Sequence, residues 1–192
     1  MDALDLLEQQ HRDVRDRLER LAAAPNLVGW QAELIDTLRA VEAHVRAEET
    51  YLYTTHSARL SDESRIESAL AEHAFIRAAA RELASAHADG PLFAARLQVL
   101  SDRFARHADD EEDWVFPKFK RSLTDEELDA LGADLDLAFN FFKEAGWAPV
   151  RALRQLPRTA ASARGNGRVE RSKPRVSARA KSRVRGSAAR AS

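Results

Sequence analysis

The sequence predicts an all-α protein, an up-down-up-down four-helix bundle followed by one more helix and a disordered basic tail. Residues 1–156 are rich in Ala, Leu, Arg and Glu, which favour helix. Apolar residues recur there at the spacing of a helix face, and no segment alternates between apolar and polar residues as a strand does. The breaks between the periodic segments are short, so neighbouring helices should run antiparallel.

Four apolar stripes predict the four long helices of the bundle. The breaks between them fall at residues 25–29, near residues 57–61 and at residues 89–91. The last break joins Gly90, which suits the end of a helix, to Pro91, which suits the start of the next. In chain order the stripes are Leu4, Leu7, Val14, Leu18 and Leu21; Leu34, Leu38, Val41, Val45 and Leu52; Ile66, Leu70, Ile76 and Leu83; and Leu97, Leu100, Phe104 and Val115.

A fifth helix is predicted after the bundle. Thr124 and Glu127 form a capping box, and the helix should run to about Lys143 before Gly146 ends it. Its apolar residues face more than one side, so it should pack on the flank of the bundle or close one end, and either a monomer or a homodimer is compatible with it. We therefore divide the chain into a bundle (1–122), an accessory helical segment (123–156) and a tail (157–192).

The tail differs in charge from the rest of the chain. Residues 157–192 hold 11 Lys and Arg and one acidic residue, Glu170, a net charge of +10. The remaining residues hold 19 basic and 30 acidic side chains, a net charge of −11. The tail has no Leu, Ile, Phe, Trp or Tyr, so it should be disordered. Spaced basic residues without aromatic ones predict binding to nucleic acid through phosphate charge, without sequence preference, or a tail that only solubilises or contacts the acidic body.

Composition excludes several classes of function. The chain has no Cys, which rules out disulfides, thiolate metal sites and cysteine catalysis. No apolar run reaches 18 residues, so we expect no membrane span. The first residues are acidic and amphipathic, unlike a secretory signal peptide, and a cytoplasmic location is the expectation.

One acidic motif with a histidine occurs twice, as HVRAEETYLY at 44–53 and HADDEEDWVF at 107–116. Each copy begins with His-x-x-x-Glu, His44 to Glu48 and His107 to Glu111, which are one helical turn apart. A single His precedes each copy on the previous predicted helix. These are His11, 33 residues before His44, and His73, 34 residues before His107. The chain therefore predicts two matching helical hairpins related by a pseudo-two-fold axis.

At about 100° per residue, the two histidines of each hairpin and one glutamate fall on the apolar side of their helices. One inward His is usually an ordinary core residue. A buried, unpaired carboxylate costs several kcal/mol, so two of them, each beside an inward His, indicate a cation between them. The predicted metal ligands are His11, His44, Glu48, His73, His107 and Glu111. Glu49 and Glu112 are expected to be neighbours of the site or to face solvent, and Tyr51 and Phe116 to point away from the core, with Tyr53 and Trp114 at its margin.

Six nitrogen and oxygen ligands without sulfur suit first-row metals such as Fe, Mn, Zn or Co. They are too many for one tetrahedral zinc and suit two metals, each with two His, bridged by both carboxylates. The His-Glu-x-x-His motif of zinc proteases is absent, and only Glu8 to His11 has the spacing of a ferritin-type site. The alternative from another functional class is a helical adaptor protein that binds no metal.

The order of these six residues resembles the haemerythrin-like (HHE cation-binding) family, as does the run from Glu111 to Pro117. The similarity covers roughly residues 2–122. It implies a four-helix bundle that holds two non-haem irons, oxo- or hydroxo-bridged, with Mn or Zn as lesser alternatives. It also implies a small diatomic or peroxide ligand, namely O₂, peroxide or nitric oxide.

The sequence departs from the oxygen-carrying members of that family at one position. Those members place a fifth His one turn after the third-helix ligand, where this chain has Arg77. With four His, each iron has at most five ligands and an open position, which favours reactivity over reversible O₂ storage. The resemblance thus implies oxidative or nitrosative stress chemistry or iron handling. The alternative is a non-enzymatic oxygen or redox sensor, or a reversible O₂-binding protein, whose basic tail contacts nucleic acid or a partner.

The phosphate-binding hypothesis for the tail is tested by deletion. Removing residues 157–192 takes away a net charge of +10, so it should abolish retention on a polyanion column at low salt. Unchanged retention of the shortened protein would contradict this role.

Overall fold

The computed structural model describes residues 1–24, 29–54, 56, 63–86, 90 and 92–146. Within these ranges every regular element is a helix. The tail that the sequence predicts to be disordered lies outside the described residues. Of the Gly90-Pro91 junction, only Gly90 is described. No helix in the described part of the chain is long and apolar enough to cross a membrane.

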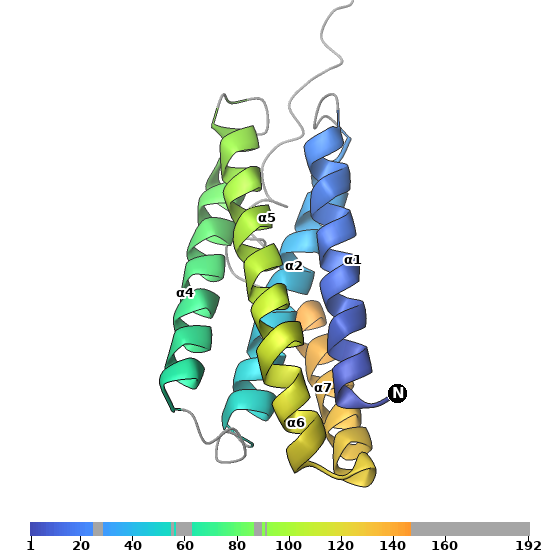
Figure 1. Ribbon diagram of the computed structural model, residues 1–192. Helices are drawn as coiled ribbons and strands as arrows, with labels where there is room; N and C mark the ends of the chain where they lie inside the picture. The colour runs from blue at the N-terminus through green and yellow to red at the C-terminus, as the bar shows by residue number, and fades with distance from the viewer. Residues whose placement is uncertain (25–28, 55, 57–62, 87–89, 91, 147–192) are drawn as a thin grey trace, which may run out of the picture. The chain divides into compact units, whose positions relative to one another are not determined.

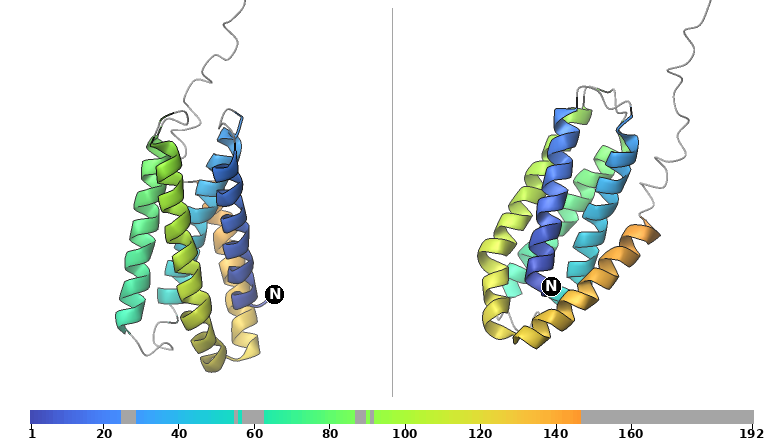
Figure 2. Two further views of the ribbon diagram at one scale, coloured as in Figure 1. Left: turned by 45° about the horizontal axis from the view of Figure 1, so that its top comes forward. Right: turned by 90° about the vertical axis from the view of Figure 1, so that its right-hand side faces the viewer.

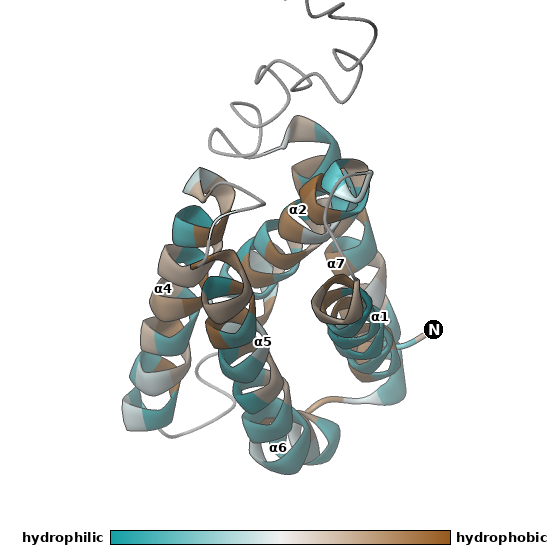
Figure 3. Ribbon diagram, turned by 90° about the horizontal axis from the view of Figure 1, so that it is seen from above, coloured by the Kyte–Doolittle hydropathy of each residue, from teal (hydrophilic) through white to brown (hydrophobic). Residues whose placement is uncertain are grey.

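Four long helices form the bundle that the sequence predicts (Figure 1). They are α1 (Ala3–Ala23), α2 (Gln31–Ala47), α4 (Glu63–Ser85) and α5 (Phe93–Asp110). Helix α2 continues into the π-helical turn η1 (Glu48–Tyr53), and α5 continues through the π-helical turn η2 (Glu111–Val115) into α6 (Phe116–Ser122). Each helix packs against the next and α5 returns to α1, so the up-down-up-down ring is closed, as the view along its axis shows (Figure 3).

Helix α7 (Asp125–Ala145) packs on the outside of the bundle, across α1 and α2 (Figure 2). The predicted capping box begins it: Thr124 Oγ1 accepts from the Glu127 amide, and Glu127 Oε2 accepts from the Thr124 amide. Gly146 ends it with φ 66°. A Cβ atom on Gly132 would lie 2.8 Å from the Met1 carbonyl oxygen, so only glycine lets α7 approach the start of α1 this closely.

The other side of α7 exposes two large apolar residues. Leu135 faces the bundle and is buried, whereas Leu137 and Phe141, one turn apart, are 70% and 66% exposed. This confirms the expectation that α7 is apolar on more than one side. A homodimer contact through it stays a prediction.

The buried residues form two apolar clusters stacked along the bundle. One includes Val14, Val41 and Phe104, and the other includes Leu7 and Phe119. On α1 the buried polar residues Gln10 and His11 lie between the two clusters, and on α5 and η2 His107 and Glu111 do so. The bundle therefore contains a polar layer between two apolar ones.

The two π-helical turns change which residues face the core. In each turn the amide after the turn bonds five residues back: Thr54 to Glu49 and Phe116 to Glu111. Each turn therefore holds one extra residue and rotates the following side chains by roughly 100° relative to a regular helix. For this reason the predictions that Phe116 points away from the core and that Tyr53 lies at its margin are wrong: they are 3% and 2% exposed.

Candidate metal centre

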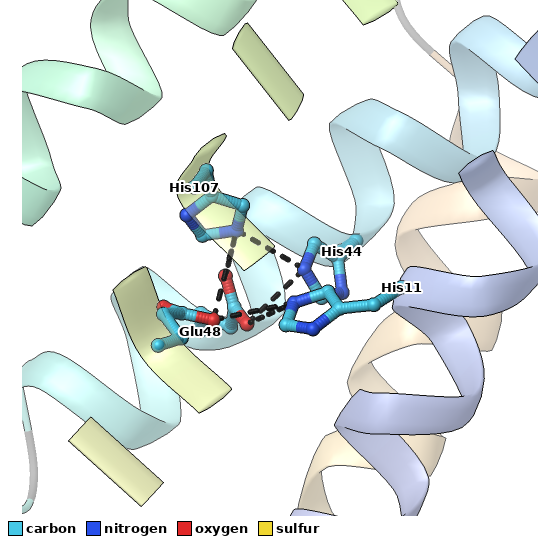
Figure 4. Close-up of side chains that lie close together, drawn as sticks. His11, His44, Glu48 and His107 are labelled. Carbon is cyan, nitrogen blue, oxygen red and sulfur yellow. Dashed lines mark hydrogen bonds and ion pairs between the residues drawn. The ribbon is translucent and has the colours of Figure 1, made fainter. Parts of the chain in front are cut away.

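The polar layer contains all six residues that the sequence predicts as metal ligands. His11 comes from α1, His44 from α2, Glu48 and Glu111 from the starts of the two π-helical turns, His73 from α4 and His107 from α5. None of the six is more than 2% exposed. Figure 4 shows His11, His44, Glu48 and His107 pointing toward one another, His11 from α1, His44 and Glu48 from the continuous segment of α2 and η1, and His107 from α5.

Glu48 lies at the centre of the layer and contacts all four imidazoles. Its Oε1 is 3.1 Å from His44 Nε2 and 3.9 Å from His11 Nε2. Its Oε2 is 3.4 Å from His73 Nε2 and 3.5 Å from His107 Nε2. Each carboxylate oxygen therefore faces one pair of histidines, and each pair comes from one hairpin.

The histidine rings repeat the pairing. The centroids of His11 and His44 are 4.8 Å apart with the planes at 72°, and those of His73 and His107 are 4.8 Å apart at 75°. The pseudo-two-fold relation predicted from the repeated motif is thus present in the ring geometry of the two hairpins.

Glu111 lies between the two histidine pairs. Its Oε2 is 3.3 Å from His11 Nε2 and 3.6 Å from His107 Nε2. Its Oε1 accepts a 2.5 Å hydrogen bond from the Tyr53 hydroxyl. Tyr53 therefore holds Oε1 of Glu111 in place, while Oε2 faces the histidines of the polar layer.

Five of the six candidate ligands are close enough to share one ion or a compact pair of ions. The ligand atoms of His11, His44, Glu48, His107 and Glu111 all lie within 4.8 Å of one another. His73 lies outside that group and joins the layer through its contact with Glu48 Oε2.

The outer nitrogens of three histidines donate to oxygen acceptors. His11 Nδ1 donates to Glu112 at 2.8 Å, His44 Nδ1 to Gln10 at 2.9 Å and His73 Nδ1 to Glu49 at 3.3 Å. A proton held on Nδ1 leaves Nε2 as a lone-pair donor, and in each case Nε2 is the nitrogen that faces the layer.

The role of Gln10 was missed by the sequence prediction. Gln10 directly precedes His11 on α1, but its side chain accepts the hydrogen bond from His44 on α2. In the structure it is buried, with 7% exposure. Its position in the sequence gives no sign of this contact. Glu49 and Glu112, expected as neighbours or solvent-facing residues, are neighbours that each bind the histidine of the other hairpin.

His11 is enclosed by two phenylalanines. The Phe116 ring stacks on it at 5.8 Å with an interplanar angle of 5°, and the Phe104 ring meets it edge-on at 5.9 Å. These apolar rings exclude water from one side of the layer, which strengthens every electrostatic interaction inside it.

Several buried atoms of the layer have no hydrogen-bond partner among the described residues. They are His11 Nε2, His73 Nε2, both oxygens of Glu48 and Glu111 Oε2. A buried carboxylate with no donor is strongly unfavourable, whereas lone pairs that converge from imidazoles and carboxylates suit a cation. The donor set therefore fits a nitrogen- and oxygen-liganded metal ion.

Burial and neighbouring charges shift the pKa values of the layer in both directions. Burial raises the pKa of Glu48, and the neighbouring charge of Glu111 raises it further. Burial also lowers the pKa of His44 well below its usual value, and the nearby His11 adds to this. The charged forms of Glu48 and His44 are thus disfavoured. For Glu111, burial is outweighed by the imidazoles of His107 and His11, which hold its pKa well below the usual value.

A helical bundle with a buried layer of imidazoles and carboxylates is typical of an all-α protein that binds cations. The sequence profile of the Hemerythrin HHE cation binding domain matches residues 2–119. This chain belongs to that family, and it is a metal-binding, haemerythrin-like protein.

A solved structure shares the fold. The crystal structure of a Hemerythrin HHE cation binding domain-containing protein from Mycobacterium kansasii aligns with a TM-score of 0.67. The two sequences are 21% identical, and the alignment covers 80% of this chain and 99% of that one. Comparison with curated proteins finds none that matches this chain.

Substitution of the layer carboxylates tests whether they bind the metal. Saturating metal should stabilise the wild-type fold, by about 2.7 kcal/mol at one hundred times Kd. Glu48→Gln and Glu111→Gln should each remove most of this stabilisation, because an amide is a weaker ligand than a carboxylate. Thermal unfolding with and without a chelator measures the difference.

The control is Glu67→Gln, at an exposed position of α4, which should keep the full stabilisation. In the chelated protein Glu48→Gln should be at least as stable as wild type, because it removes a buried charge. Full stabilisation of Glu48→Gln by metal would show that Glu48 is not a ligand.

Proposed function

We propose that this protein holds two non-haem irons in the polar layer and reacts with O₂, peroxide or nitric oxide. The observation that carries the proposal is the division of Glu48 between the two histidine pairs, with Oε1 facing His11 and His44 and Oε2 facing His73 and His107. A carboxylate in this position would hold two ions, one for each histidine pair. Glu111 Oε2, close to one histidine of each pair, supports the same arrangement.

The proposed ligands are four histidines and two glutamates, which leaves fewer than six protein ligands for each ion. Two irons held by these residues would supply redox chemistry, with coordination positions left open to a small oxidant. The protein residues hold the ligands in place: Gln10, Glu49 and Glu112 fix imidazole orientation, and Tyr53 fixes Glu111.

The structure also bears on the position where oxygen carriers have another histidine. Arg77 binds Glu49 and Glu42, and among the described residues its guanidinium forms no hydrogen bond or ion pair with the six candidate ligands. Because an arginine stays protonated, it does not ligate a metal. Its presence supports a reactive centre over a reversible O₂ carrier.

Iron loading tests the proposal directly. After iron-replete expression or anaerobic reconstitution, the protein should contain about two irons per chain and show near-ultraviolet charge-transfer absorption. Mixing with O₂, H₂O₂ and NO should change that absorption for at least one of them. Less than half an equivalent of any transition metal would contradict the proposal.

Turnover separates the enzyme from the sensor. An enzyme consumes many equivalents of peroxide or O₂ per chain, whereas a sensor binds its oxidant stoichiometrically. The sensor is the second candidate because of the charge contrast between the acidic body and the basic residues 157–192, which offer a partner or nucleic acid an electrostatic contact.

A further inference from the structure

One arginine reaches the polar layer through a carboxylate. Arg77 lies one turn after His73 on α4 and binds Glu49 with two hydrogen bonds, at 2.9 Å to Oε1 and 2.7 Å to Oε2. Its Nε donates to Glu42 at 3.3 Å. Such a two-point contact fixes the plane of a carboxylate as well as its position.

Glu49 passes this constraint to a candidate ligand. Its Oε1, the same oxygen that Arg77 binds, accepts the Nδ1 proton of His73 at 3.3 Å. The contacts therefore run from Arg77 on α4 to Glu49 on η1 and from Glu49 back to His73 on α4. The orientation of the His73 ring therefore depends on Arg77 as well as on Glu49.

The other hairpin provides an internal comparison. Arg15 lies one turn after His11, as Arg77 does after His73, but it binds Asp109 and the Ala105 carbonyl oxygen. Glu112, which holds His11 and has a 34% exposed side chain, accepts no hydrogen bond from an arginine among the described residues. The hydrogen bond from His11 lowers the pKa of Glu112, and the charge of Arg15 adds to this without fixing the plane of the carboxylate. The pseudo-two-fold relation thus holds for the ligands but not for the arginines.

From this difference we infer that Arg77 is a positioning residue for the half of the metal centre formed by His73 and His107, and that Arg15 has no such role for the half formed by His11 and His44. This inference rests on the proposed two-metal function. It predicts that the two ions, although bound by matching ligands, respond differently to substitution of matching arginines.

A metal titration of the full-length protein tests the inference. Co²⁺ is a suitable probe because it accepts nitrogen and oxygen ligands and its ligand-field absorption reports their geometry. Arg77→Gln should weaken one of two Co²⁺ equivalents by about tenfold or more, the range seen when a contact that orients a ligand is removed. The matched variant Arg15→Gln should weaken neither.

The ligand-field spectrum distinguishes positioning from loss of stability. Arg77→Gln should alter the absorption of one Co²⁺ equivalent, whereas Arg15→Gln should leave the spectrum unchanged. Thermal unfolding of the chelated variants checks that both are folded. Equal effects of the two substitutions, or no effect of Arg77→Gln on affinity and spectrum, would overturn the inference.

A double-mutant cycle tests whether Arg77 acts through Glu49. Glu49→Gln alone should also weaken one Co²⁺ equivalent, and adding Arg77→Gln to it should have little further effect. Additive effects would overturn the inference. Failure of the wild-type protein to bind Co²⁺ or iron at all would instead contradict the proposed function, so the two failures are distinguishable.

Discussion

The structure depends on a buried carboxylate that four imidazoles share. Glu48 is 0% exposed, has no hydrogen-bond donor among the described residues, and lies between histidines from α1, α2, α4 and α5. Without a cation this arrangement is unfavourable, because burial disfavours the charged carboxylate. A cation held by the same atoms would link all four helices of the bundle. Metal binding and the packing of the bundle are therefore coupled.

The contacts outside the ligands couple the two hairpins further. Glu49 of the first hairpin binds His73 of the second, and Glu112 of the second binds His11 of the first. Neither hairpin can orient its own first histidine alone. The apolar clusters on both sides of the layer, which each draw residues from several helices, add the hydrophobic stabilisation that brings the hairpins together.

The sequence predicted the parts of the site that follow from local periodicity. The bundle, the capping box at Thr124 and the burial of all six candidate ligands depend on helix geometry within single segments, and the structure agrees with them. Phe116 and Tyr53 were predicted wrongly because a uniform 100° per residue does not allow for the extra residue in a π-helical turn. The sequence contained no turn residue that would have indicated it.

The contacts between hairpins were beyond sequence reasoning for a different reason. Which carboxylate meets His11 or His73 depends on how helices dock, and Glu112 is 101 positions from His11. Gln10 and Arg77 were likewise assigned no contact at the layer, since the sequence does not show which side chains of the other helices they meet. Positions that act through another residue are the hardest to recognise without coordinates.

The central claim is that Glu48 bridges two ions, each held by one histidine pair. The most direct measurement is anomalous X-ray scattering at the iron edge from crystals of the iron-loaded protein. We expect two peaks, one beside His11 and His44 and the other beside His73 and His107, with an oxygen of Glu48 at each. A single peak, or peaks that Glu48 does not contact, would contradict the claim.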